Sequence, residues 1–244
     1  MPIRDFRTEP KVAQWRETVR TAGCSIRTLS PLKLLHKKNG ELLFALCEAD
    51  ARDPQGRPLD RYVFIRGHAV IVVPLLLNRR TGEERFLMIC QRRIGNGILN
   101  LEFPAGMLDR DIHRPGAVAV RELFEETGIR IKRADLFPLH DRPLYSSPGA
   151  DDEAIHYFGC VIRLSDREFG SLEGRAAGNA GDGESITVTL RTRREAEHET
   201  TSLQVRLGLH LFADAIDKRE ESLTRIVPAQ RDTVRKPSIP KPLR

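Results

Sequence analysis

The feature that most constrains this chain is a group of three carboxylates, Glu122, Glu125 and Glu126, within five consecutive positions. On a helix, residues three and four apart share one side, so all three side chains would point the same way. Like charges placed in this way destabilise a helix unless a cation neutralises them. An oxygen-only cluster suits a hard divalent cation such as Mg²⁺ or Mn²⁺. The group therefore predicts a metal site, and the alternative is a solvated, charge-rich surface helix.

The residues around the acids predict the ends of this helix. Pro115 suits a first turn, where its missing N–H costs nothing, and Gly128 suits a left-handed residue after the last turn. Arg121 precedes Glu125 by four residues, and we expect the two to pair. The side of the helix opposite the acids is expected to pack on the core through Val120, Leu123, Phe124 and Thr127.

The distribution of charge argues against a nucleic-acid-binding surface. The chain has 244 residues and a net charge of +6, but residues 223–244 alone carry +5. The remainder is close to neutral, which disfavours extended contact with a phosphate backbone. The basic segment contains four prolines and is expected to be an extended tail.

The cysteines and the apolar runs bear on the cellular location. The four cysteines are scattered, without a C-x-x-C pair, so reduced thiols in a cytoplasmic protein are expected. No apolar run reaches the roughly 18–20 residues of a membrane span, and the first residues have no apolar signal-peptide core.

The pattern of apolar residues predicts three regions. Residues 1–62 are expected to form a β-rich accessory region, 63–222 the main domain, and 223–244 the tail. In the accessory region we expect a helix within 6–19 and a hairpin over 33–46 around the Asn39-Gly40 turn. We also expect a strand at 62–65, after a turn at the end of the accessory region. In the main domain we expect strands at 69–77, 86–90, 99–103, 155–162 and 185–190, and a closing helix on which Leu203, Leu207, Leu211 and Ala215 recur every four residues.

The motif around the acids resembles the signature of the Nudix hydrolases. The matching positions are Gly106, Arg121, Glu122, Leu123, Glu125, Glu126, Gly128 and Ile129. One residue more than in the family pattern separates Gly106 from Arg121, and His113 stands eight before the arginine where the family has Glu. A similar elongated loop is found in plant ADP-sugar diphosphatases of this family. Asp109 and Asp111 lie in the same loop and are expected to be solvated turn residues.

The resemblance implies an α/β/α sandwich with a mixed sheet. It further implies that Glu122 and Glu126, with Glu125 and the Ala105 carbonyl, hold Mg²⁺ or Mn²⁺. Glu184, in a Glu-Ser-Ile-Thr-Val stretch that follows a glycine-rich segment, would be the general base, and Glu125 would take that role failing it. Without the resemblance, Glu184 would be read as an ordinary loop residue.

Three further elements resemble substrate contacts of the ADP-ribose pyrophosphatase subgroup. Gly149, in Ser-Pro-Gly, and the nearby Glu153 are expected at the nucleotide, although such a turn is equally compatible with a plain surface loop. Arg93 is expected to neutralise a diphosphate oxygen, unless it only solvates a strand end. Glu102 would contact substrate or form a salt bridge with Arg93.

The resemblance implies an enzyme that hydrolyses ADP-sugars such as ADP-ribose and ADP-glucose. A UDP-glucose diphosphatase is the alternative within the family, because the base is recognised by loops without a readable code. A binding module without turnover is the alternative from another class; Arg121 and the three acids argue against it, and His113 argues mildly for it. The N-terminal hairpin is expected to contribute to a homodimer, and no membrane partner is expected.

Overall fold

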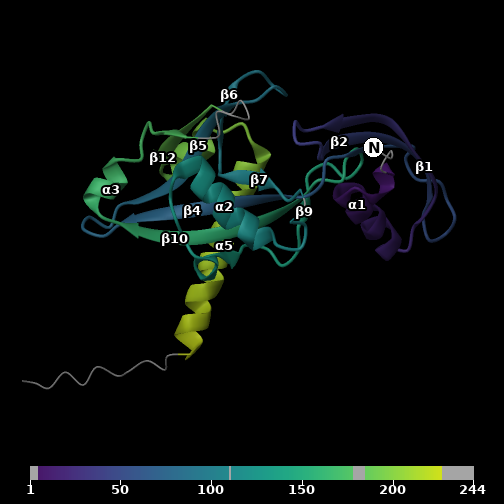
Figure 1. Cartoon of the computed structure of the whole chain (residues 1–244). Coiled ribbons are helices and arrows are strands. Elements are labelled where there is room, and N and C mark those ends of the chain that lie inside the picture. The colour runs from purple at the N-terminus through teal and green to yellow at the C-terminus, as the bar shows by residue number, and fades with distance from the viewer. Residues whose placement is uncertain (1–4, 110, 178–184, 227–244) are drawn as a thin grey trace, which may run out of the picture.

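The chain forms two β-sheets that lie side by side in a computed structural model describing residues 5–109, 111–177 and 185–226 (Figure 1). The smaller, N-terminal sheet is antiparallel, in the order β1-β2-β3. Its elements are η1 (Phe6–Thr8), α1 (Pro10–Thr21), β1 (Ser25–His36), β2 (Leu42–Arg52) and β3 (Tyr62–Ile65). We call these elements the N-terminal unit. Because β3 pairs with β2, the N-terminal unit extends to Ile65, a little past the predicted boundary at residue 62.

The predicted hairpin is confirmed, and its strands are longer than expected. Gly40 has a φ of 83° and its N–H donates to the Lys37 carbonyl at 2.9 Å, as the Asn39-Gly40 pair indicates. Small residues of β2 alternate inward at Ala45, Cys47 and Ala49, and α1 packs over them through the buried Val12. Val12 and these small residues belong to one buried apolar cluster between α1 and the sheet.

The larger sheet has nine strands and is mixed. Its strands follow the order β11-β12-β5-β4-β10-β8. In addition, β6 pairs with β5, β7 pairs with β4 and β9 pairs with β10. Only β4 and β10 run parallel among the described strands; the other pairs are antiparallel. The strands are β4 (Ala69–Asn78), β5 (Glu84–Arg92), β6 (Leu99–Glu102), β7 (Ala105–Met107), β8 (Phe137–Pro138), β9 (Leu144–Tyr145), β10 (Ala154–Leu164), β11 (Ala176–Ala177) and β12 (Ile186–Arg191).

Helices cover both faces of this sheet, so the predicted α/β/α sandwich is confirmed. On one face, Val70 and Val72 of β4 pack with α2 (Pro115–Thr127) and α3 (Asp166–Gly170). On the other, Ile71 and Val73 pack with α4 (Arg193–Glu199) and α5 (Leu203–Ile226). The central strand is therefore apolar at consecutive positions, as expected for a strand buried on both faces. The 3₁₀ turn η2 (Arg133–Asp135) follows α2.

The predicted closing helix is confirmed, but its apolar repeat of four does not coincide with the buried face in the first half of the helix. Leu203 is 80% exposed, whereas Val205, Leu209 and Phe212 are buried. A repeat of four advances about 40° around a helix at each step, so it drifts away from the core. The observed spacing alternates between four and three and keeps one face on the sheet.

Helix α4 was not among the predicted elements, although its start carries a sequence signal. Thr192 accepts a hydrogen bond from the Glu195 N–H at 3.2 Å, and the Glu195 carboxylate accepts from the Thr192 N–H at 2.7 Å. A Thr followed three residues later by Glu is a capping box, which marks a helix start. None of the described helices is long and apolar enough to pass through a bilayer.

Two of the leucines of α5, Leu203 and Leu209, provide a test of this packing. We expect Leu209→Ala to lower the free energy of unfolding by about 2–5 kcal/mol, because it leaves a cavity in the core. Leu203→Ala should change it by less than about 0.5 kcal/mol, because its side chain is exposed. Urea unfolding followed by circular dichroism measures both, and equal effects would contradict the assignment of the buried face.

Candidate active site

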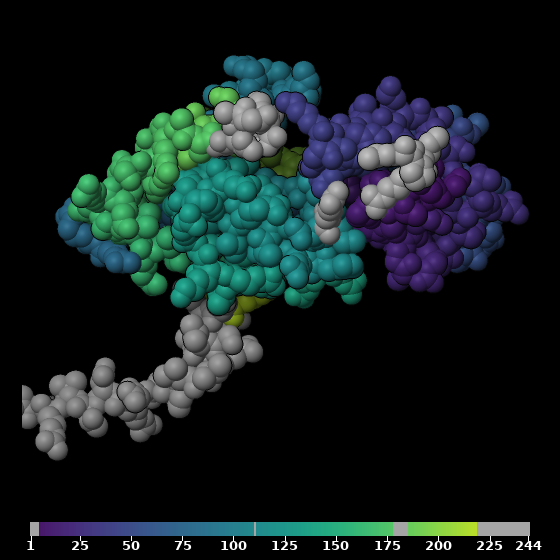
Figure 2. All heavy atoms as spheres, viewed as in Figure 1, coloured from purple at the N-terminus to yellow at the C-terminus, as the bar shows by residue number. Residues whose placement is uncertain are grey.

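The loop between β7 and α2 brings the predicted metal-binding segment onto the central strand. β7 pairs with β4 from Ala105 opposite Ile71 to Met107 opposite Ala69. α2 then begins at Pro115 and ends before Gly128, whose φ is 71°, so both predicted helix signals are confirmed. In the space-filling view, the teal stretch that contains α2 forms the front of the body beside the purple N-terminal unit (Figure 2).

Glycine at position 106 is required by the close approach of Glu122. A Cβ atom there would lie 2.1 Å from Glu122 Cδ, far inside van der Waals contact. The absence of a side chain thus lets the Glu122 carboxylate lie directly over the loop backbone. This gives a physical reason for a glycine ahead of the acids in the motif.

The three acids of α2 have different surroundings. Glu126 is 5% exposed, and its Oε2 accepts a hydrogen bond from the Ala105 N–H at 3.0 Å. Glu122 is partly buried, and Glu125 is exposed. Glu122 and Glu126 are therefore both brought against Ala105 and Gly106, while Glu125 faces solvent. The prediction that all the acids lie opposite the buried side of the helix is wrong for Glu126, because the loop backbone covers it.

Arg121 pairs with different acids from the one predicted. Its Nη2 donates to Glu122 Oε1 at 3.0 Å, and its Nη1 lies 3.4 Å from Asp111 Oδ2. The expected pair with Glu125 is therefore wrong as a direct contact. Partial burial opposes the charge of Arg121, but the hydrogen bond to Glu122 and the neighbouring carboxylates outweigh it and raise its pKa. Arg121 thus links the loop to the first acid of the helix.

The chemistry of these side chains fits a hard divalent cation. Their donors are carboxylate oxygens, and two of them converge on the same stretch of loop backbone. Within the described residues, no three His, Cys, Asp or Glu side chains are already grouped closely enough to hold a metal. Participation of Glu125 would therefore need a change of its side-chain conformation, and the metal site stays a prediction.

Arg93 and Glu102 form a pair at the ends of β5 and β6. Arg93 Nη2 donates to Glu102 Oε2 at 2.7 Å, and Nε lies 3.1 and 3.2 Å from the two carboxylate oxygens. The salt bridge with Arg93, which was one of the two roles expected of Glu102, is thus present. Contact of either residue with substrate stays a prediction. The β5–β6 ladder holds Glu102 opposite Ile89, at the entrance to the Ala105 loop.

The segment from Ser147 to Glu153 is a turn that reaches back to the N-terminal unit. The N–H groups of Ala150 and Asp151 both donate to the Ser147 carbonyl, at 2.9 and 3.0 Å. Gly149 is exposed, and a Cβ atom at this position would meet no other atom within 4 Å. Glu153 is buried, and its Oε1 lies 3.2 Å from Arg66 Nη2. The predicted roles of Gly149 and Glu153 in substrate binding stay predictions.

Glu184 lies outside the described residues. The strand that follows it begins at Ile186, which pairs with Gln91 on β5. This pairing places the start of β12 opposite a residue two positions before Arg93. The role of Glu184 as general base stays a prediction.

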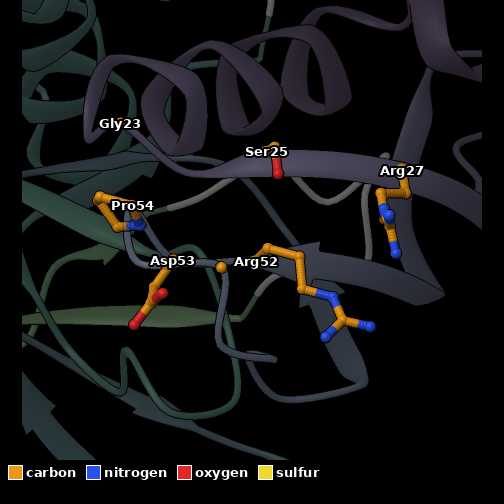
Figure 3. Close-up of a pocket in the computed structure, with 7 residues that line it drawn as sticks. Gly23, Ser25, Arg27, Arg52, Asp53 and Pro54 are labelled. Carbon is orange, nitrogen blue, oxygen red and sulfur yellow. The ribbon is translucent and has the colours of Figure 1, made fainter.

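A hollow of about 400 Å³ lies in the N-terminal unit, at the ends of β1 and β2 (Figure 3). Asp53 and Arg52, which line it, already have partners in the fold. Asp53 accepts hydrogen bonds from the Gln55 and Arg57 backbone, and Arg52 pairs with Asp50 at 3.1 Å. Asp53 therefore holds the turn between β2 and β3, and the Arg52–Asp50 pair lies within β2.

A polar cluster at the junction of the two sheets was not predicted. His68 Nδ1 is 3.2 Å from Gln14 Nε2, and its ring centroid is 5.9 Å from that of His156. Burial, with a smaller contribution from His156, lowers the pKa of His68 to about 4. His68 directly precedes β4 and His156 lies within β10, and neither single histidine carries a sequence pattern that would have identified this cluster.

Comparisons with known proteins agree with this architecture. Residues 66–173 match the family model of the NUDIX domain. Nudix hydrolase 14, chloroplastic, from Arabidopsis thaliana is 33% identical over 184 residues, which are 72% of this chain and 58% of that protein. ADP-sugar pyrophosphatase from Mus musculus is 34% identical over 120 residues, 49% of this chain and 50% of the relative. ADP-ribose pyrophosphatase from Bacillus subtilis (strain 168) is 32% identical over 109 residues, which are 45% of this chain and 54% of that protein.

The chain thus spans only about half to three fifths of the length of these relatives. Among solved structures, that of an ADP compounds hydrolase superimposes with a TM-score of 0.54. The match covers 80% of this chain and 95% of the other, at 16% identity, and so bears on the fold alone.

His68 predicts a dependence of stability on pH. Its pKa is lower in the folded protein than the usual 6.5. As the pH falls, the unfolded chain therefore binds a proton at His68 at a higher pH than the folded protein does, and this binding favours unfolding. The free energy of unfolding should therefore fall as the pH drops from about 6.5 to 4, by about 1–2 kcal/mol after allowance for partial solvent access.

The comparison of His68→Gln with the wild type measures this contribution. Urea unfolding at pH 7 and pH 4.5 should show a smaller acid loss in His68→Gln, whereas His198→Gln, at an exposed position of α4, should behave like the wild type. Parallel pH curves for all three proteins would contradict the assignment.

Proposed function

This chain belongs to the Nudix hydrolase family, and we propose that it hydrolyses the diphosphate bond of ADP-sugars such as ADP-ribose and ADP-glucose. The products would be AMP and a sugar phosphate. The observation that carries this proposal is the convergence of Glu122 and Glu126 on the Ala105–Gly106 backbone. That convergence supports a cation-assisted reaction at the residues of the family motif.

Nudix hydrolases generally use divalent metal ions, and the proposed cofactor here is Mg²⁺ or Mn²⁺. Glu122, Glu125, Glu126 and the Ala105 carbonyl would hold it, and it would supply neutralisation of the diphosphate and a lower pKa for a bound water. Arg121 would keep Glu122 in place through the hydrogen bond described above.

The remaining predicted residues would handle the diphosphate and the proton. Arg93 would bind a diphosphate oxygen through its planar guanidinium, with Glu102 fixing the orientation of that group. Glu184, or Glu125 in its absence, would accept the proton of the attacking water. The water oxygen would bond to phosphorus as the bridging P–O bond breaks, and the leaving phosphate would carry the electron pair.

The names of the relatives favour an adenine nucleotide. Two of them are named for ADP-sugar or ADP-ribose, and this supports the substrate class over UDP-glucose. A binding module without turnover is the third candidate, because His113 replaces the earlier Glu of the family motif.

Activity assays on a panel of substrates test the proposal. With Mg²⁺ present, we expect release of AMP from ADP-ribose or ADP-glucose, and a loss of kcat on the order of 10²-fold or more in Glu126→Gln. Glu84→Gln, at the exposed start of β5, is the matched control and should retain activity. Preference for UDP-glucose would overturn the proposed ADP-sugar substrate but keep the reaction. Tight binding of a nucleotide sugar without turnover would identify a binding module.

We also propose that the chain forms a homodimer through the N-terminal sheet. Apolar side chains are exposed on that sheet at Leu32, Leu35, Leu46 and Tyr62. Leu46 lies in β2 between Lys33 of β1 and Phe64 of β3, so its side chain stands in the middle of the sheet. Exposed apolar patches of this kind are typical of protein–protein contacts.

A single charge in this patch should break the dimer. We expect Leu46→Glu to elute as a monomer in size-exclusion chromatography with light scattering, because the contact would have to remove a carboxylate from water in the middle of an apolar patch. Ile94→Glu, in the fully exposed β5–β6 loop, should keep the mass of the wild type. A dimer in Leu46→Glu, or a monomeric wild type, would refute this interface.

A cytoplasmic location is likewise a proposal. All four cysteines are free thiols, which supports a reducing compartment. The name of the Arabidopsis relative places that protein in the chloroplast. Fractionation of cells expressing the full-length protein would distinguish the two locations.

A further inference from the structure

Asp109 has an unusual backbone conformation in the middle of the loop that precedes α2. Its φ is 45°, and among the described residues it is the one non-glycine residue with a positive φ. Such a conformation is unfavourable for an L-residue and persists when the surrounding structure holds it in place. The expectation of a solvated turn residue is wrong, because the Asp109 side chain is ion-paired and only 24% exposed.

Two lysines from the N-terminal unit hold the Asp109 carboxylate. Lys37, directly after β1, donates from Nζ to Oδ2 at 2.6 Å. Lys11, in the first turn of α1, places its Nζ 2.9 Å from Oδ1. Asp109 is therefore connected to two elements that are distant from it in sequence.

Lys11 is built into the junction between the two sheets. It is 3% exposed, and its Nζ also donates to the Leu43 carbonyl at 3.1 Å. Its aliphatic chain lies against Gly67, where a Cβ would come within 2.9 Å of Lys11 Cγ. Burial lowers the pKa of this lysine, although Asp109 opposes the shift. A lysine in such surroundings is costly to bury, and the ion pair offsets that cost.

Further contacts fix the N-terminal unit to the body near this point. The carboxylate of Asp152 accepts hydrogen bonds from the Arg66 and Gly67 N–H groups, at 2.7 and 3.0 Å. The Leu108 N–H donates to the His68 carbonyl at 3.0 Å. The connection between β3 and β4 is thus held from both sides, so the two lysines approach Asp109 from a fixed support.

We propose that Lys11 and Lys37 act as a clamp on Asp109, through which the N-terminal unit positions the Ala105–Gly106 backbone against Glu122 and Glu126. The role assigned to the clamp in metal binding rests on the proposed function. Asp109 is the third residue after Gly106, so the clamp fixes the chain immediately beyond the two residues that contact the acids. Lys11, Lys37 and Asp109 are positioning residues in this arrangement.

The choice of charged residues supports a positioning role. Apolar side chains of similar size often stabilise a buried site as well as an ion pair does, whereas an ion pair specifies one geometry. Residues that orient the groups around a metal typically change metal affinity by roughly 10–100-fold when they are replaced. Loss of the half-exposed Lys37 is therefore expected to affect metal binding more than the stability of the fold.

Three substitutions test the clamp. Asp109→Asn removes the charge but keeps a residue that tolerates a positive φ. Lys37→Met removes one partner at a half-exposed position, where folding should be preserved. Lys11→Met keeps the aliphatic contact with Gly67 and removes the buried charge. Lys33→Met, at an exposed position of β1, is the matched control.

The first readout is binding of Mn²⁺ alone, measured by electron paramagnetic resonance without substrate. We expect the Kd of the metal to rise about 10-fold in Asp109→Asn and in Lys37→Met, and to stay unchanged in Lys33→Met. Amide hydrogen exchange over residues 105–109 should become faster in the clamp variants. The thermal midpoint should change little in Lys37→Met, where the lysine is half exposed, and should fall in Asp109→Asn, which leaves the buried Lys11 without its carboxylate. In the active enzyme, the loss should appear in kcat more than in KM.

Unchanged Mn²⁺ affinity and unchanged exchange in folded Asp109→Asn and Lys37→Met would overturn the proposal. A fall in the thermal midpoint with normal metal affinity would also overturn it, because it would indicate a purely structural role. If the wild-type chain hydrolyses no nucleotide sugar, the proposed function fails by itself, whereas metal binding and exchange still report on the clamp.

Discussion

The contact of α2 with the Ala105–Gly106 backbone is the constraint on which the arrangement of the site depends. Glu126 accepts the Ala105 N–H, and Glu122 passes so close to Gly106 that no side chain fits there. A buried carboxylate is tolerated because it has a backbone donor. The pairing of β7 with β4 fixes the loop from one side and the sheet-facing residues of α2 fix the helix from the other. Two acids and a backbone segment are thereby held together before any ligand binds.

The sequence was most informative where a residue has a local conformational meaning. Pro115 and Gly128 mark the ends of α2, and Asn39-Gly40 marks the hairpin, because each depends on the φ of one or two residues. The central strands were recognisable because a strand buried on both faces must be apolar throughout. The family motif then identified Glu122 and Glu126, which the structure brings to the same loop.

Contacts between distant segments could not be predicted in the same way. Arg121 has acids at several positions within reach, and spacing alone favoured Glu125 over the observed Glu122 and Asp111. Asp109 looked like a solvated turn residue because its partners lie in α1 and after β1. The buried face of α5 could not be read from its repeat of four, because an exposed leucine and a buried one look alike in a short apolar repeat. In each case the outcome depends on how the surrounding elements pack, and the sequence next to the residue does not record that packing.

The parallel pairing of β4 with β10 has a consequence for how the protein acquires its site. These strands are adjacent in space, yet the chain between Asn78 and Ala154 contains β5, β6, β7 and α2. Closing so long a connection costs chain entropy before the pairing can offset it, and such topologies fold slowly. The N-terminal unit, with its local hairpin, can form early during synthesis, whereas the loop before α2 acquires its final shape only after the central strands have met. The support of the Ala105–Gly106 loop thus depends on a pairing of large sequence separation, whereas the β1–β2 hairpin depends on local contacts alone.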